Sequence, residues 1–145
     1  MTADGPGIIG DATFGDALNE RFVASLPLDG NPVSNFVFSH VAEGSAGGTQ
    51  PYFTGIAMYN PNNNDVSVSI DVFSQNGVKT GSATIPLARG SRTSKTLPQL
   101  IPELTNQVGG YIRISTAGGP IVAFELFGDQ VLQFLAAVPP QPINP

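Results

Sequence analysis

The strongest constraint in this sequence is a run of alternating apolar and polar residues that an Asn-Gly pair divides. Between positions 66 and 73, valine or isoleucine occupies every second position as far as Val72, and alternation resumes at Ala83, Ile85 and Leu87. Alternation with a period of two is typical of a β-strand with one buried face. Asn-Gly readily adopts the positive φ angles of a two-residue type I′ turn, so residues 65–87 predict an antiparallel hairpin.

The turn and the apolar pattern predict the same register for this hairpin. If Asn76 and Gly77 are the two turn centres, Gln75 faces Val78. The same count places Val68 opposite Ile85, so that the apolar side chains of both strands share one face.

A second hairpin is predicted between residues 110–116 and 121–128, joined by a loop at residues 117–120. A five-residue loop ending at Ile121 places Arg113 opposite Glu125, whereas a four-residue loop places Arg113 opposite Phe124. Matching of opposite charges favours the first register. It predicts that Arg113 and Glu125 form a structural ion pair.

The remaining apolar segments predict an all-β fold. Strands are expected near residues 35–41, 52–60, 91–97 and 131–138, and a short helical turn at 98–104 is expected to cover the core with Leu100, Ile101 and Leu104. Seven or eight short strands with almost no helix indicate an antiparallel β-sandwich, Ig-like or jelly-roll-like. We expect an N-terminal extension at 1–31, the sandwich at 32–138 and a stiff Pro-rich tail or linker at 139–145.

Several motifs of this chain resemble those of a known family. They are the strand Ile56-Ala-Met-Tyr-Asn-Pro61, the Asn-Gly hairpin, Leu97-Pro98 before the helical turn, Gly110-Tyr-Ile-Arg-Ile114, Ala123-Phe-Glu-Leu-Phe-Gly128 and a closing Leu-Ala-Ala-Val-Pro strand. The pattern is similar to β-sandwich modules, often repeated, of large secreted or surface proteins of environmental bacteria. The resemblance covers roughly residues 35–139. It implies a β-sandwich and an extracellular or cell-surface setting, with no established activity and no site residues.

The N-terminal extension contains a second copy of the closing-strand pattern. Residues 22–28 are similar to residues 134–140. Two explanations remain open: residues 22–28 are the closing strand of a neighbouring module, or two short apolar strands are similar by chance. We expect these residues to form a strand at a sheet edge that can pair with a neighbouring module or a second copy of the chain. The predicted assembly strand comprises Phe22, Val23, Ala24, Ser25, Leu26, Pro27 and Leu28.

Charge and composition exclude several functions. The net charge of −5 has the wrong sign for a nucleic-acid surface, and the absence of Cys excludes thiol catalysis and disulfides. No apolar run reaches the length of about 20 residues that spans a bilayer. Because the first residues carry acids and no basic region, they are not typical of an export signal, so any such signal is expected to lie outside this sequence.

Catalytic residues, metals and cofactors are not expected. His40 is the only histidine and is expected to be an ordinary strand-end residue. A hydrolase would need Glu125 to converge with Asp71 or Glu103 in a cleft, and no sequence spacing pairs them. The oxygen-rich segment 60–65 matches no calcium loop, so its Asn and Asp side chains are expected to bond their own backbone.

Two surface features bear on binding. A glycan- or protein-binding module would require Tyr52, Tyr59 and Tyr111 to share one surface. Arg89, Arg92 and Lys95 are expected to guard an edge strand against aggregation. The leading expectation is a non-catalytic, self-assembling extracellular module, and the alternatives are an adhesion module and, more remotely, a hydrolase.

Overall fold

The structure, a computed structural model, describes residues 10–16, 18–19, 22–27, 31–45, 51–104 and 106–143. These residues form an all-β fold, as predicted, with one short helix, α1 (Leu97–Leu100). None of the described helices is long or apolar enough to cross a membrane. The strands are β1 (Asp11–Gly15), β2 (Val23–Pro27), β3 (Asn35–Phe38), β4 (Ala42–Glu43), β5 (Tyr52–Tyr59), β6 (Val66–Phe73), β7 (Lys79–Leu87), β8 (Arg92–Thr96), β9 (Gln107–Val108), β10 (Tyr111–Ala117), β11 (Val122–Asp129), β12 (Leu135–Val138) and β13 (Gln141–Pro142).

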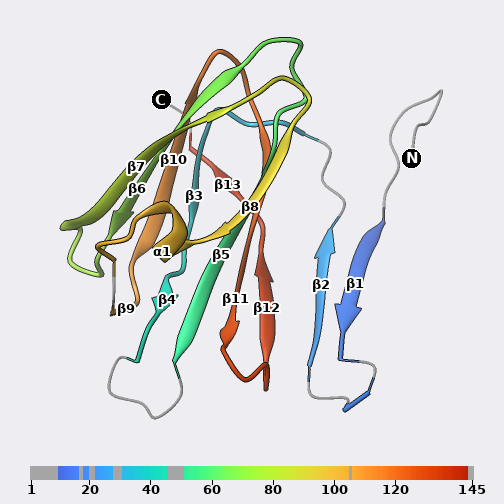
Figure 1. The fold of residues 1–145 in the computed structure, drawn as a ribbon, viewed down its shortest axis with the longest axis vertical. Coiled ribbons are helices and arrows are strands. Elements are labelled where there is room, and N and C mark those ends of the chain that lie inside the picture. The colour runs from blue at the N-terminus through green and yellow to red at the C-terminus, as the bar shows by residue number, and fades with distance from the viewer. Residues whose placement is uncertain are drawn as a thin grey trace.

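Two antiparallel sheets form the sandwich (Figure 1). The five-stranded sheet has the order β13-β3-β10-β6-β7, and the four-stranded sheet has the order β12-β11-β5-β8. Alternate residues of each strand point between the sheets, as the period-two pattern requires. Residues of α1 and the following turn join this core, as predicted for the helical turn. The buried core comprises Phe36, Phe38, Val41, Ile56, Met58, Val66, Val68, Ile70, Val72, Leu87, Leu97, Leu100, Ile101, Leu104, Ile112, Ile114, Ile121 and Ala123.

The register predicted for the β6–β7 hairpin is confirmed, since Val68 lies opposite Ile85. The predicted type I′ turn at Asn76 and Gly77 is not present. Gly77 has a φ of 75° while Asn76 does not have a positive φ, and the Gly77 N–H donates to the Ser74 carbonyl oxygen at 3.0 Å. A three-residue turn therefore replaces the two-residue turn, and a bulge between Val72 and Phe73 restores the expected register beyond it.

The second predicted hairpin does not exist. Strand β10 pairs with β3 and β6, whereas β11 pairs with β5 and β12, so residues 117–121 carry the chain from one sheet to the other. Arg113 lies opposite Val37 and Asp71, and Glu125 lies opposite Ile56 and Val138. The predicted Arg113–Glu125 ion pair is therefore wrong. An alternating pattern shows which face of a strand is buried but not which strand lies beside it.

The ends of the chain also depart from expectation. Val23–Pro27 is a strand, as predicted for residues 22–28, but it pairs with β1 in a separate two-stranded sheet rather than at the edge of a main sheet. Leu28 lies outside the described residues. The described part of the predicted tail, residues 139–143, is not a free spacer: β13 pairs with β3, and the Ile143 N–H donates to the Asn35 carbonyl oxygen at 3.0 Å.

Candidate functional site

The outward surface of the four-stranded sheet is apolar. Register places Phe124 of β11 beside Ala57 of β5, and Val122 beside Tyr59. Their chain neighbours Ile56, Met58 and Ala123 point into the core, so these four residues point outward. We call the surface formed by Phe53, Gly55, Ala57, Tyr59, Val122, Phe124 and Leu126 the outer face. An outward sheet surface of this composition indicates that something covers it.

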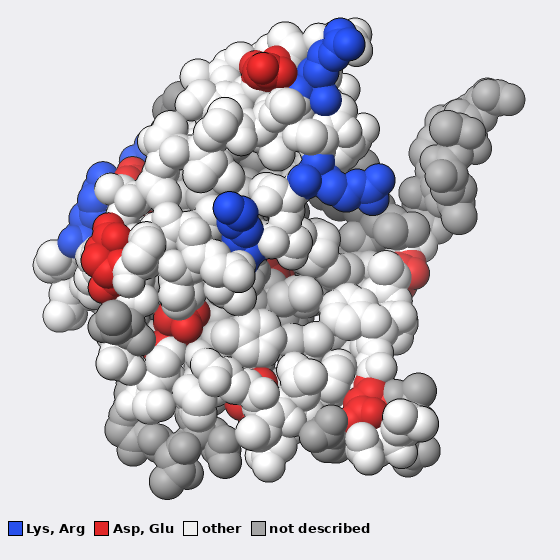
Figure 2. Space-filling model, viewed as in Figure 1, with Lys and Arg blue, Asp and Glu red and all other residues white. Residues whose placement is uncertain are grey.

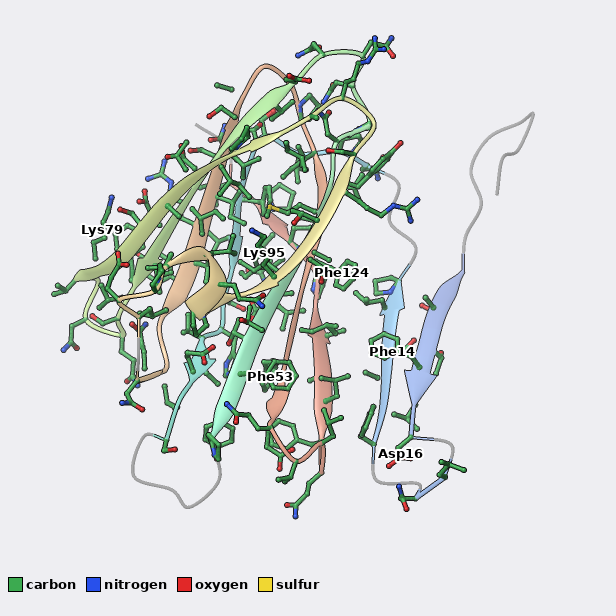
Figure 3. All side chains as sticks on the ribbon, viewed as in Figure 1. Phe14, Asp16, Phe53, Lys79, Lys95 and Phe124 are labelled. Carbon is green, nitrogen blue, oxygen red and sulfur yellow. The ribbon has the colours of Figure 1, made fainter. Side chains whose placement is uncertain are left out.

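The hairpin formed by β1 and β2 lies next to the outer face, on its β12 side. Strand β2 lies beside β12 (Figure 1), and it buries Ala24 and Leu26 while Val23 is 72% exposed. Figure 3 shows Phe14 on this hairpin and Phe124 on the neighbouring side of the sandwich. A groove of about 390 Å³ lies between the two, lined by Ala12, Phe14, Leu26, Pro27, Asn31, Val122, Ala123, Phe124, Pro139 and Pro140.

The half of the outer face toward β8 carries two further grooves. One, of about 180 Å³, is lined by residues of β5, β8 and β11 that include Phe53 and Lys95. The other, of about 390 Å³, includes Tyr59 and Arg92. Phe124 lines both of these grooves and the groove at the hairpin. Figure 2 shows basic side chains in blue over the upper part of this side of the molecule, with uncharged surface between them, and acidic side chains in red lower on the same side.

Inside the sandwich, β11 carries a buried carboxyl. Glu125 has no exposed surface, and neither of its side-chain oxygens has a hydrogen-bond partner among the described residues. Burial raises the pKa of Glu125 to about 8, so the side chain is protonated and uncharged at neutral pH. A neutral carboxyl avoids the much larger cost of an unpaired buried charge.

Two other ionisable groups, the partly buried His40 and the buried Glu43, lie where β3, β4 and β5 end or begin. Burial lowers the pKa of His40, whose ring centroid lies 3.9 Å from that of Phe127. Burial raises the pKa of Glu43, and the Thr54 N–H, which donates to Oε2 of Glu43 at 3.1 Å, partly opposes this. His40 follows the end of β3, as expected for a strand-end residue.

The structure separates the predicted binding tyrosines. Tyr52 and Tyr59 occupy opposite ends of β5, and the Tyr52 ring lies 6.1 Å from Phe134. Tyr111 lies on the five-stranded sheet, with its ring stacked on Phe73 at 4.8 Å. The three therefore share no surface, and Tyr59 alone among them belongs to the outer face.

The carboxyls considered for a hydrolase do not converge on Glu125. Asp71 lies on the five-stranded sheet, where its Oδ1 accepts a hydrogen bond from Nζ of Lys79 at 2.7 Å. Glu103 follows the helix α1 and is exposed, whereas Glu125 is fully buried, and Glu103 lines none of the grooves described above.

The Asn-rich turn at 60–65 bonds backbone groups, as predicted. Nδ2 of the buried Asn60 donates to the carbonyl oxygens of Asn64 and Leu87, both at 2.9 Å. Asn62 reaches the Pro120 carbonyl oxygen at 2.8 Å. These bonds tie the turn to the crossover loop and fix the end of β5 that carries Tyr59.

Sequence reasoning missed the outer face. Its signal was present in β11, where Val122, Phe124 and Leu126 are apolar on one face while Ala123 and Phe127 are apolar on the other. A strand that is apolar on both faces is typical of a sheet that is covered on both sides.

No family model matches this chain, and no curated protein matches it. Among solved structures, the crystal structure of Thermotoga maritima 1070 is similar, with a TM-score of 0.60 and 10% sequence identity. The match covers 78% of this chain and 97% of that chain. At this identity the likeness shows a shared fold alone.

Proposed function

We propose that this protein is a non-catalytic structural module of a cell-surface protein or fibre, and that copies assemble by exchanging the β1–β2 hairpin. One observation carries the proposal: the hairpin forms its ladder within itself, and its apolar side lies beside β12 and lines a groove together with Val122 and Phe124 of the outer face. The extracellular setting is supported by the resemblance of residues 35–139 to modules of secreted proteins.

Exchange would preserve the contacts that hold the hairpin. Because β1 and β2 pair with each other, both strands would move together without losing their backbone hydrogen bonds. The same apolar side, including Leu26, would then fill the same groove on the next copy. Exchange of an identical element between copies is a low-cost route to assembly, and a head-to-tail contact propagates into a chain.

The distribution of charge favours head-to-tail contacts. Residues 1–78 contain eight acids and one base, whereas residues 79–145 contain three acids and five bases. The N-terminal hairpin of one copy would thus approach a more basic part of the next copy, which speeds encounter and disfavours like-to-like contacts.

Cross-linking tests the exchange directly, because the chain has no native cysteine. In the double variant Leu26→Cys with Phe124→Cys, both thiols line the hairpin groove, and a short bis-maleimide can join them. Exchange predicts covalent dimers and larger species on a denaturing gel. Ser25→Cys with Phe124→Cys is the matched control, since Ser25 lies on the opposite, exposed side of β2. Cross-links confined to single chains at every protein concentration would contradict exchange.

Light scattering provides the second measurement. Leu26→Asp places a charge on the buried side of β2, and Ser25→Asp places the same charge on the exposed side. We expect the first variant to lose assembly and the second to retain it. A wild-type protein that stays monomeric up to high concentration would refute self-assembly.

A further inference from the structure

A row of unpaired cations lies at the β8 edge of the sandwich. Arg89 belongs to the turn before β8, and Arg92 and Lys95 belong to β8 itself, an edge strand of its sheet. None of their side chains forms a hydrogen bond or ion pair within the part of the chain that the structure describes. The chain as a whole carries a net charge of −5, so this edge is a local exception to the overall charge, and its positive charge attracts an anionic ligand.

An exposed aromatic ring adjoins these cations. Tyr59 lies directly opposite Arg92 across the β5–β8 ladder, and it is 43% exposed. A hollow of about 350 Å³ is lined by Tyr59, Gly90 and Arg92. The groove of about 390 Å³ on the outer face shares Tyr59 and Arg92 with this hollow, so the two form one continuous concave surface.

The backbone around the hollow is held in place by hydrogen bonds. The Asn60 N–H donates to the Ser91 carbonyl oxygen at 3.0 Å, and the Ser91 N–H donates to the Ala88 carbonyl oxygen at 3.0 Å. The Arg89 N–H donates to Oδ1 of Asp65 at 2.9 Å. Gly90, with a φ of 64°, has open space where a Cβ would lie, so no side chain fills the hollow at this position.

We propose that this surface binds an acidic polysaccharide, with one sugar ring stacked on Tyr59 and its carboxylate on Arg92. The apolar face of a pyranose ring matches an exposed tyrosine ring, and a guanidinium binds a carboxylate through two parallel hydrogen bonds. Arg92 lies on the same face of the sheet as Tyr59, and Arg89 belongs to the turn that leads into this hollow, so both cations are near a chain of carboxylates that crosses the β8 edge. Tyr59 and Arg92, the two residues that carry the proposal, do not line the hairpin groove, although the adjoining outer-face groove shares Val122 and Phe124 with it.

Titration calorimetry with a polygalacturonate oligosaccharide tests this site. Wild type is expected to bind, and Arg92→Ala is expected to weaken the affinity by about tenfold or more, since one hydrogen bond to a charged group is worth about that much. Tyr59→Ala is also expected to weaken the affinity, because it removes the ring on which the sugar stacks. Tyr59→Phe keeps the ring and should retain binding. Arg113→Ala is the matched control, because it removes an exposed cation from the other sheet.

Three comparison ligands identify the class of partner. A neutral glucan of similar length should bind weakly or not at all, because it lacks carboxylates. Polyglutamate and a single-stranded oligodeoxynucleotide of matched charge should bind more weakly than the oligosaccharide and should be insensitive to Tyr59→Ala. Absence of polygalacturonate binding, equal binding of either comparison polyanion, or equal loss in Arg113→Ala would overturn the proposal.

Discussion

The two sheets of the sandwich differ in what their strands place inside and outside. Strand β6 buries Val66, Val68, Ile70 and Val72 and turns serines and Asp71 outward, where Asp71 pairs with Lys79. Strand β11 buries the unpaired carboxyl of Glu125 and turns Val122, Phe124 and Leu126 outward.

Strand β6 has the pattern that favours stability, with apolar residues inside and polar residues outside, and β11 departs from this pattern on both faces. A buried carboxyl without a hydrogen-bond partner lowers stability, and exposed apolar area invites association. Natural proteins break local rules of this kind mainly at functional sites. The four-stranded sheet is therefore the side of the molecule on which we expect binding, and the five-stranded sheet is its solvated support.

The largest effect is expected from Glu125→Gln, measured as unfolding free energy against pH. The pKa of Glu125 is raised from an ordinary value of 4.5 to about 8. Between these pH values the folded protein retains a proton that the unfolded chain releases, so wild-type stability falls as pH rises and levels off above about 8. The loss is on the order of 1.4 kcal/mol per pH unit over this interval. The variant should lack this loss.

The comparison of wild type with the Glu125→Gln variant isolates this one group. Glu43, whose pKa is also raised, adds a loss of the same sign, and His40, whose pKa is lowered, adds a gain as pH rises through the range near 6.5. Both groups are present in both proteins. Urea unfolding should show similar stabilities at pH 5 and a more stable variant at pH 9. Parallel curves from pH 5 to 9 would mean that Glu125 is paired or solvated.

A smaller effect is expected from Phe124→Ser, which removes the aromatic ring common to the three grooves. Loss of apolar contact should weaken the seating of the hairpin by about 1–3 kcal/mol. Hydrogen exchange should accelerate at the amides of Ala24 and Leu26 more than at those of Val68 and Ile70. The control is Val78→Ser at an exposed position of the β6–β7 turn. Uniform acceleration throughout the chain would instead indicate a general role of Phe124 in the fold.

The sequence predicted the fold class and the β6–β7 register because the apolar alternation there is strict on one face only. It did not predict that β10 and β11 lie in different sheets, since both have apolar positions that can pair with several strands. The wrong hairpin also led to the wrong ion pair. Arg113 was predicted to lie opposite Glu125, but Arg113 lies on the other sheet. The apolar outward residues of β11 could be read from the sequence, but the residues that lie beside them on the outer face depend on which strands β11 joins.

The turn of the β6–β7 hairpin allows a test of the local backbone geometry. Only Gly77 has a positive φ there, with open space around it, so Gly77→Ala should cost about 1 kcal/mol through backbone strain alone. Asn76→Ala should change stability by less than about 0.5 kcal/mol, as for an ordinary surface position. A type I′ turn would make both substitutions costly. Urea midpoints of the two variants distinguish the geometries.

A small effect is also expected from Asp71→Asn, the counterpart of Glu125→Gln on the solvated sheet. The Asp71–Lys79 ion pair has side chains that are 32% and 50% exposed, respectively. Water and salt screen such a pair, so its removal should cost about 0–1 kcal/mol at low salt and less at high salt. Urea unfolding at two ionic strengths measures this. A cost as large as the pH-dependent change at Glu125 would show that the two sheets do not differ in the environment they give a carboxyl group. A small, salt-sensitive cost beside a large, pH-sensitive effect would place the two carboxyls in distinct dielectric surroundings, one in water and one in the core.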